Sequence, residues 1–171
     1  MTLNEFVKKY SGPKLAITIT GGGVSFAEIA SIPGVSNILH SIYIPYSDKA
    51  LKKYILQHNL IIETSAVSEK RIYQLFNCSI SENPNCLHII ISAALTTTRY
   101  RKGKNHAMIF VAENKTDTDM DFCELELEKL DEPEYDFLIG IHGLETLRKK
   151  EDQQITYKVL ELLESRITKN G

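Results

Sequence analysis

The chain has 171 residues and a formal net charge of −2 at pH 7, with a pI near 6.2. This length suits one domain with a single core, and the near-neutral charge excludes the basic field that recruits nucleic acid or an anionic membrane. We therefore expect residues 1–171 to form a single domain that binds neither. No apolar run approaches the roughly 20 residues of a membrane-spanning helix. The N-terminal stretch also lacks the apolar centre of a secretory signal, which predicts a cytoplasmic protein.

Cysteine usage predicts free thiols. Cys78, Cys86 and Cys123 are odd in number and show no paired metal-ligand spacing. Neither a disulfide framework nor a zinc site is therefore supported. We expect no metal and no other cofactor.

Hydrophobic spacing predicts alternating helices and strands in the first half of the chain. Lys14–Ile19 is typical of a buried strand because apolar and β-branched residues alternate there. Three glycines, Gly21–Gly23, follow it directly, and Ile32–Gly34 ends the next helix. The predicted elements are, in order, a helix around 3–7, this strand, a helix around 26–30, a helical piece at 36–40, a strand at 41–46, a helix at 48–57 and a helix that begins at Ser65 or Ser68.

The second half contains the most strand-like segment, Leu87–Leu95, whose continuously apolar sequence is typical of a central strand covered on both faces. We expect His88 within it to be a core histidine. Further strands are predicted at His106–Asn114 and at Asp121–Leu130, and the second alternates glutamates with apolar residues, as an edge strand does. A last helix carries apolar residues at i, i+4, i+7, i+8 and i+12 from Ile155. The predicted fold class is α/β: a three-layer α/β/α sandwich with a mixed, mostly parallel sheet.

The glycines between strand and helix raise the question of a ligand. Such a turn gathers unpaired N–H groups and the positive end of a helix dipole, which favour an anion such as phosphate or carboxylate. Gly21–Gly23 match neither the dinucleotide-binding pattern nor the Walker pattern. A tight turn with close helix packing is the alternative, and the glycines alone leave both possibilities open.

Several motifs occur in the order and spacing of a known family. They are "TITGGG", a Pro-Gly turn at Pro33 and Gly34, "PYSDKALKKY", and "AVSE" at Ala66–Glu69. Together they resemble the C-terminal domain family of the competence/damage-inducible protein CinA, whose active members are nicotinamide-nucleotide amidases. The resemblance extends to Leu87–Leu95 and the last helix and covers most of the chain outside Asp117–Leu147. It implies a CinA-like α/β domain.

The resemblance also implies where amidase chemistry would lie. In those amidases a serine attacks the carboxamide of nicotinamide mononucleotide, a lysine assists, and ammonia leaves; a hydroxyl nucleophile needs such a base nearby. At the matching positions this sequence has Thr18 and Leu51, and leucine cannot accept a proton. Lys49, Lys52 and Lys53 are offset from that position, and a shift of one residue turns a helical side chain by about 100°. We therefore expect ordinary amidase activity to be lost.

A basic loop follows the predicted central strand, where the amidases share a Gly-Ile-Ala-Gly-Pro sequence. This chain has "SAALTTTRYRKGKNH" instead, which is similar to the loop of a divergent CinA-like branch. Arg99, Arg101 and Lys104 concentrate positive charge beside the sheet end, and arginine pairs well with phosphate oxygens. The loop is either a solvated charged segment or part of an anion site.

Our first hypothesis is a CinA-like domain that binds a nucleotide-like or other anionic small molecule without amidase chemistry. The expected ligand-binding residues are Gly21, Gly22, Gly23, Tyr46, Ser47, Arg99, Arg101 and Lys104. Because relatives self-associate, we also expect a homodimer.

Two other hypotheses remain open. In the second hypothesis the protein is an active C–N hydrolase. Thr18, Thr20 or Ser25 is then the nucleophile that attacks a carboxamide, and ammonia is released. In the third it is a protein-interaction module whose contact surface is the segment Asp117–Leu147.

Overall fold

The computed structural model describes residues 1–58, 67–140 and 143–169. The predicted helix start at Ser65 lies outside these residues, whereas Ser68 caps a helix, its hydroxyl accepting from the Arg71 N–H at 3.1 Å. The elements are α1 (Leu3–Lys9), β1 (Leu15–Thr20), the 3₁₀ helix η1 (Val24–Ser31), the 3₁₀ helix η2 (Val35–Asn37), β2 (Leu39–Tyr43), α2 (Asp48–Leu56), α3 (Glu69–Glu82), β3 (Leu87–Ala94), β4 (His106–Ala112), β5 (Asp121–Glu126), α4 (Glu132–Gly140) and α5 (Gly143–Lys169).

The strands form one mixed sheet in the order β2-β1-β3-β4-β5. β1 is parallel to both of its neighbours, while β4 is antiparallel to β3 and to β5. β5 therefore points the same way as β1, β2 and β3, and only β4 runs against them. This confirms the predicted mixed, mostly parallel sheet with Leu87–Leu95 at its centre.

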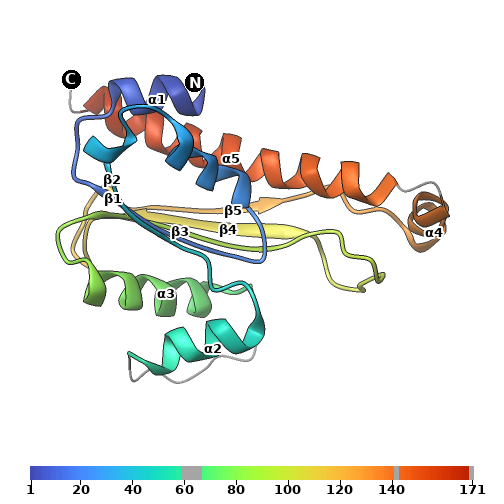
Figure 1. The fold of residues 1–171 in the computed structure, drawn as a ribbon. Coiled ribbons are helices and arrows are strands. Elements are labelled where there is room, and N and C mark those ends of the chain that lie inside the picture. The colour runs from blue at the N-terminus through green and yellow to red at the C-terminus, as the bar shows by residue number, and fades with distance from the viewer. Residues whose placement is uncertain (59–66, 141–142, 170–171) are drawn as a thin grey trace.

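Helices cover both faces of the sheet. α1, η1 and α5 lie over one face, and α2 and α3 lie on the other side (Figure 1). Alternate side chains of each strand enter opposite layers: Leu15 and Ile17 pack with Ile155 of α5, whereas Ile90 packs with Leu75 of α3. The predicted three-layer α/β/α arrangement is confirmed. No helix within the described ranges is both long and apolar enough to cross a bilayer.

Several predicted elements differ in their bounds from the structure. The helical piece expected at 36–40 ends at Asn37, and the strand expected at Asp121–Leu130 ends at Glu126. The strand expected at 41–46 begins earlier and ends at Tyr43, because Pro45 has no N–H to donate to a neighbouring strand. The segment after the glycines is helical but adopts the tighter 3₁₀ form, in which the Phe26 N–H donates to the Gly23 carbonyl at 3.0 Å.

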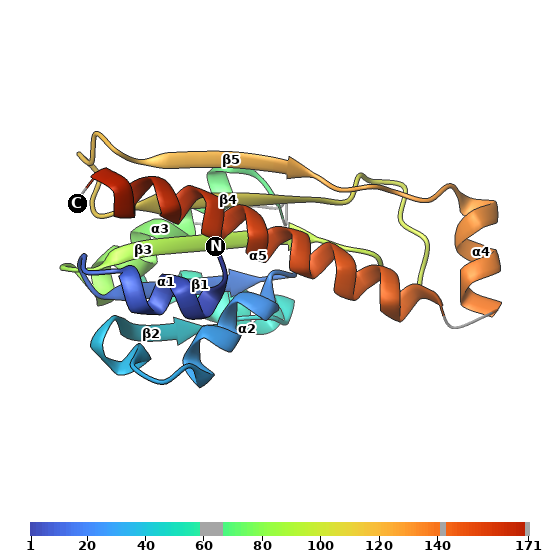
Figure 2. The same cartoon turned by 90° about the horizontal axis from the view of Figure 1, so that it is seen from above.

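α4 is a helix that hydrophobic spacing did not predict. Asp131 caps it, since its carboxylate accepts from the Glu134 N–H at 2.9 Å, and Pro133 lies in the first turn, where proline is tolerated. α5 extends beyond the sheet, and α4 lies next to its far end (Figures 1 and 2). The segment around α4 is therefore an addition at one end of the sandwich.

The strand order places a crevice at the carboxyl ends of β1 and β3. The chain leaves β1 toward β2 on one side, and after β2 it crosses to β3 on the other side of β1. Ligands in open α/β sheets bind at such a switch point. The residues that follow β1 and β3 are therefore the place to look for a site.

A buried histidine should make folding sensitive to acid. His88 is fully buried in β3, its Nδ1 lies 2.7 Å from the Ser79 hydroxyl, and burial lowers its pKa from 6.5 to about 4. The unfolded chain binds this proton more readily, so stability is lost as the pH falls from 6.5 toward 4. We expect the protein to lose about 2 kcal/mol between pH 7 and pH 5 from this residue. In urea titrations at both pH values, His88→Gln should show a smaller difference than the wild type; equal differences would contradict this assignment.

Candidate functional site

The glycine loop, Gly21–Gly23, packs directly against β3 and α5. Gly21 and Gly23 have φ values of +77° and +85°. A Cβ on Gly21 would lie 1.9 Å from the carbonyl oxygen of Ala93, and one on Gly23 would lie 2.9 Å from Ile91 and 3.0 Å from Ile155. Close packing and left-handed backbone together therefore account for the glycines.

The N–H groups at the start of η1 are occupied by a side chain of α5. The carboxylate of Asp152 accepts from Gly23 at 2.8 Å, from Val24 at 3.1 Å and from Ser25 at 2.8 Å. The glycines form a tight turn with close helix packing, and the anion that the Gly23 amide contacts in this structure is the protein's own carboxylate. The expected ligand contact at the Gly23 amide is thus occupied by Asp152.

Removal of the Asp152 carboxylate should loosen η1. We expect Asp152→Ala to destabilise the protein by about 2 kcal/mol, because three N–H groups lose a charged acceptor. Asp152→Asn keeps one carbonyl oxygen and should cost about half as much. Urea unfolding of the two variants measures this order, and equal losses would show that the charge and the second oxygen contribute nothing.

Arg148 of α5 joins three segments at the switch point. Its Nη1 donates to the Thr96 carbonyl at 2.6 Å, and its Nη2 donates to the Tyr46 hydroxyl at 2.5 Å and, at 3.5 Å, to the Gly21 carbonyl. The glycine loop, the chain after β3 and the β2–α2 connection therefore meet at one guanidinium group. Beside it lies a cleft of about 450 Å³, which we call the threonine cleft; it is lined by Tyr46, Thr96, Thr97, Thr98, Leu144, Glu145 and Arg148.

A buried carboxylate fixes the wall of the threonine cleft. Glu151 is 2% exposed, and its carboxylate accepts from the Thr96 N–H at 2.9 Å and from the Thr96 hydroxyl at 2.7 Å. The Asn105 side-chain amide donates to the same carboxylate at 2.8 Å and to the Thr96 hydroxyl oxygen at 3.1 Å. Because every donor here has an acceptor, Thr96 is held in one position.

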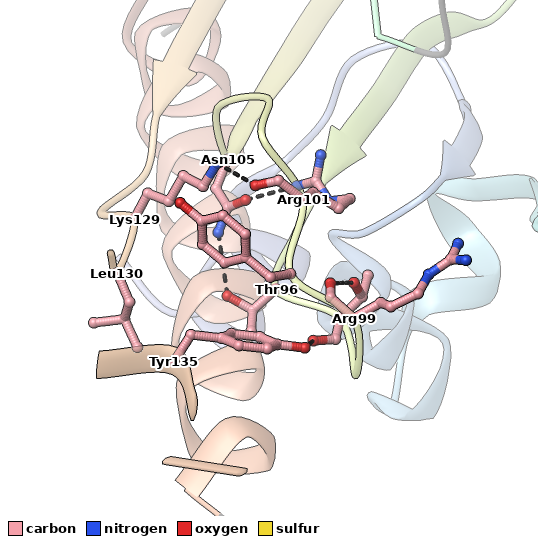
Figure 3. Close-up of a pocket in the computed structure, with 9 residues that line it drawn as sticks. Thr96, Arg99, Arg101, Asn105, Lys129, Leu130 and Tyr135 are labelled. Carbon is pink, nitrogen blue, oxygen red and sulfur yellow. Dashed lines mark hydrogen bonds between the residues drawn. The ribbon is translucent and has the colours of Figure 1, made fainter. Parts of the chain in front are cut away.

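The cationic side chains of the basic loop differ in whether they bind other groups of the protein. The Arg101 guanidinium donates to the Leu95 carbonyl at 3.2 Å and to Asn105 Oδ1 at 2.6 Å, which closes the loop on itself. Lys104 forms an ion pair with Glu124 at 2.6 Å on the exposed face of the sheet. Arg99 is exposed: its carbonyl accepts from the Thr97 hydroxyl at 2.6 Å, but within the part of the chain that the structure describes its guanidinium group has no hydrogen-bond or ion-pair partner. Figure 3 shows its side chain directed away from the neighbouring Asn105 and Arg101.

The candidate nucleophile Thr18 lies inside the sheet. Its side chain is 2% exposed and lies near the hydroxyl of Tyr54 in α2, which donates to the Glu82 carboxylate at 3.4 Å. Burial, with the nearby Glu82, raises the pKa of Tyr54 well above its usual value of 10, so this phenol stays protonated and cannot serve as a base. Leu51, at the lysine position, is buried beside it.

The other candidate hydroxyls form hydrogen bonds that hold the backbone and helices. Thr20 donates to the Pro45 carbonyl at 3.2 Å, and Ser47 caps α2 by accepting from the Ala50 N–H at 3.1 Å. Ser25 lies 2.6 Å from the hydroxyl of Thr156 on α5. In the described parts of the chain, the hydroxyl groups of Thr20 and Ser25 have no hydrogen bond to a histidine, lysine or carboxylate side chain.

Sequence reasoning missed the residues that organise this site. Arg148, Glu151 and Asp152 were not among the expected site residues, and neither was Asn105. A signal was present: counting back from Ile155 in steps of three, four and seven reaches 152, 151 and 148, so the buried face of α5 continues with charged residues. Charged side chains on a buried helix face require partners, and here those partners are the loops after β1 and β3.

Comparison with known proteins identifies the fold. Neither a protein-family profile nor a curated protein sequence matches the chain. Among solved structures, competence/damage inducible protein CihA from Agrobacterium tumefaciens is similar with a TM-score of 0.62 and 12% identity, over 94% of this chain and 92% of that one. A competence or damage-inducible protein from Enterobacter asburiae is similar with a TM-score of 0.63 and 13% identity, over 96% of this chain and 98% of that one. For a CinA superfamily protein from Klebsiella pneumoniae 700603 the TM-score is 0.58 and the identity is 14%, over 88% of this chain and 98% of that one.

These similarities confirm the predicted CinA-like α/β fold. They cover 94% and 96% of this chain in the two structures with the highest of these TM-scores. A common fold does not by itself carry a common activity.

Proposed function

We propose that this CinA-like domain binds a nucleotide-like or other anionic small molecule in the threonine cleft, and that it does not catalyse serine–lysine amidase chemistry. The observation that carries the proposal is the position of Arg148. Its guanidinium group lies at the carboxyl ends of β1 and β3, where α/β sheets bind ligands, and borders the cleft.

The lining of the cleft suits a ligand with a planar ring and an anionic group. Tyr46 is 51% exposed and presents an aromatic ring, while Leu144 and the threonine methyl groups add apolar surface. Arg148 supplies a guanidinium that can pair with a phosphate or carboxylate, and the exposed Arg99 lies in the adjoining basic loop. Gly21 borders the site through its carbonyl, which Arg148 contacts. Ser47 follows Tyr46 and caps α2.

The loss of amidase chemistry is supported by the surroundings of Thr18. A hydroxyl nucleophile needs a base, but its neighbour Tyr54 stays protonated and Leu51 has no titratable group. The lysines of α2 lie elsewhere: Lys49, Lys52 and Lys53 are exposed, and Lys52 forms an ion pair with Asp48 at 2.7 Å.

Calorimetric titration tests the binding proposal. The full chain is titrated with nicotinamide mononucleotide, adenosine monophosphate and inorganic phosphate. We expect a nucleotide to bind more tightly than phosphate, and Arg148→Gln to weaken that binding at least about tenfold, which is 1.4 kcal/mol. The matched control is Lys150→Gln, because Lys150 is exposed on α5 and does not line the cleft. Thermal unfolding verifies that both variants are folded. Absence of binding by all three probes, or equal affinity of Arg148→Gln and wild type, would contradict the proposal.

An ammonia-release assay tests the chemistry. With nicotinamide mononucleotide as substrate we expect no release above the uncatalysed background. Turnover that disappears in Thr18→Ala, Thr20→Ala or Ser25→Ala would instead identify an active C–N hydrolase with that hydroxyl as its nucleophile. Binding without turnover in the wild type is the outcome that fits the proposed function.

The exposed face of α4 favours a second candidate, a protein-interaction role for residues 117–147. Phe137 is 68% exposed and Ile139 is 43% exposed on a helix at the end of the molecule (Figure 2). A second copy of this chain is the first partner to test, by gel filtration at increasing protein concentration. A dimer that dissociates in Phe137→Ser would support this role, and an unchanged elution volume in that variant would exclude Phe137 from the contact.

A further inference from the structure

A second, smaller cavity also borders Thr96 and Thr97, but its other walls come from the basic loop, from the segment before α4 and from Tyr135 in the first turn of α4. Figure 3 shows it from one side, with Asn105, Lys129 and Tyr135 around it. Its volume is about 20 Å³. A single water molecule needs about 10–15 Å³, so this cavity has room for one particle of that size.

The walls of this cavity are held by their own hydrogen bonds. The Tyr135 hydroxyl donates to the Thr97 carbonyl at 2.6 Å, and its ring meets the ring of Tyr100 edge-on, with centroids 5.5 Å apart. The two N–H groups of the Asn105 amide are used by Thr96 and Glu151. The cavity is therefore preformed and does not depend on a loop closing over it.

The charge around the cavity has one sign. Arg99, Arg101 and Lys129 line it, and among the described residues no aspartate or glutamate does. Lys129 Nζ donates to the carbonyls of Arg101, at 2.5 Å, and of Gly103, and lies 5.0 Å above the Tyr100 ring. These neutral groups satisfy hydrogen bonds without cancelling the positive charge.

The buried carboxylate of Glu151 does not line this cavity. Asn105 separates it from Glu151, because its Oδ1 accepts from Arg101 while its amide nitrogen donates to the Glu151 carboxylate. Half-buried cations in proteins are normally balanced by an anion. In the described structure, several hydrogen-bond donors remain available to such an anion. They are the third N–H of Lys129, the Nε and Nη1 groups of Arg101, and the Tyr100 hydroxyl.

We infer that this cavity is a binding site for a single monatomic anion, and that chloride is the physiological candidate. The cavity is too small for phosphate or a nucleotide, and its cationic lining excludes metal ions. The bound anion balances Lys129 and Arg101 and so stabilises the connection between the basic loop and the segment that leads into α4. The inference does not rest on the proposed function, because it does not use Arg148, and Thr96 and Thr97, which border both cavities, contribute no charge to this one.

Thermal unfolding at constant ionic strength tests this site. Wild-type protein is melted in mixtures of sodium chloride and sodium gluconate of equal total concentration. We expect the melting temperature to rise with the chloride fraction; at ten times the dissociation constant, the folding equilibrium constant should increase about elevenfold. Bromide should replace chloride, and its anomalous signal in a crystal should lie beside Lys129. A melting temperature that does not depend on the chloride fraction would overturn the inference.

Two lysine variants separate the site from a general salt effect. Lys129→Met removes the charge and should abolish the chloride dependence, whereas Lys102→Met removes an exposed charge of the same loop and should keep it. Arg148→Gln should also keep it, even if ligand binding in the cleft is lost. If Lys129→Met unfolds, the bromide position in the wild type decides the question. Equal chloride dependence in the wild type and in Lys129→Met would show that the anion binds elsewhere.

Discussion

Gly21→Ala should prevent the protein from folding. The added Cβ would lie 1.9 Å from the carbonyl oxygen of Ala93, and both atoms belong to backbone segments that side-chain rotation cannot separate. The residue also has a φ of +77°, which costs a non-glycine residue about 1–2 kcal/mol before any contact is counted. Relief of the contact would require β1 and β3 to move apart in the middle of the sheet.

The expected loss for Gly21→Ala exceeds about 4 kcal/mol, which is most of the stability of an ordinary domain. Circular dichroism and urea unfolding measure it. The matched control is Gly103→Ala in the basic loop, where a new Cβ would meet only the end of the Arg101 side chain at 3.8 Å. We expect that control to change the stability by less than about 0.5 kcal/mol. A folded Gly21→Ala variant with wild-type stability would show that the glycine loop is not packed as described.

Glu151→Ala should be the next most damaging change. It removes the acceptor of the Thr96 N–H, the Thr96 hydroxyl and the Asn105 amide in a place with almost no solvent access. Buried donors without acceptors cost about 1–3 kcal/mol each, and a water molecule that enters the space can satisfy some of them. We therefore expect a loss of about 3 kcal/mol in urea unfolding.

Two further variants show whether Glu151 acts through these hydrogen bonds. Glu151→Gln has the same shape but presents one oxygen and one NH₂ group, so it should recover part of the loss. Gln154→Ala lies three residues further along α5 in an exposed position and should cost less than about 0.5 kcal/mol. If Glu151→Ala and Gln154→Ala have the same stability, the buried network does not hold the loop.

Most of the fold follows from local patterns in the sequence. The apolar runs of β1 and β3 predict buried strands because a strand covered on both faces needs apolar residues at every position. The glutamate alternation of β5 predicts the edge of the sheet, where the structure places it. α4 escaped prediction because its helix is short and its apolar residues Phe137 and Ile139 are exposed, so no helical stripe appears in the sequence.

Only part of the candidate site can be predicted from the sequence. The glycines predict a special turn after β1, but what occupies its N–H groups is decided by Asp152, which is 129 residues from Gly23 along the chain. The sequence of the basic loop predicts an excess of positive charge. It does not predict that Arg101 binds within the loop while Arg99 faces solvent, because this depends on the contacts of Arg101 with Asn105 and Leu95. Such pairings are set by how α5 lies on the sheet, and no local pattern contains that information.

The place of α5 at the end of the element order has a consequence for biosynthesis. The loops after β1 and β3 leave the ribosome well before Arg148, Glu151 and Asp152 are translated. With 129 residues between Gly23 and Asp152, synthesis at about 5–20 residues per second leaves the η1 amides without their carboxylate for roughly 6–26 s. The nascent chain therefore carries these loops as open backbone donors, and the site is assembled only when the last helix docks.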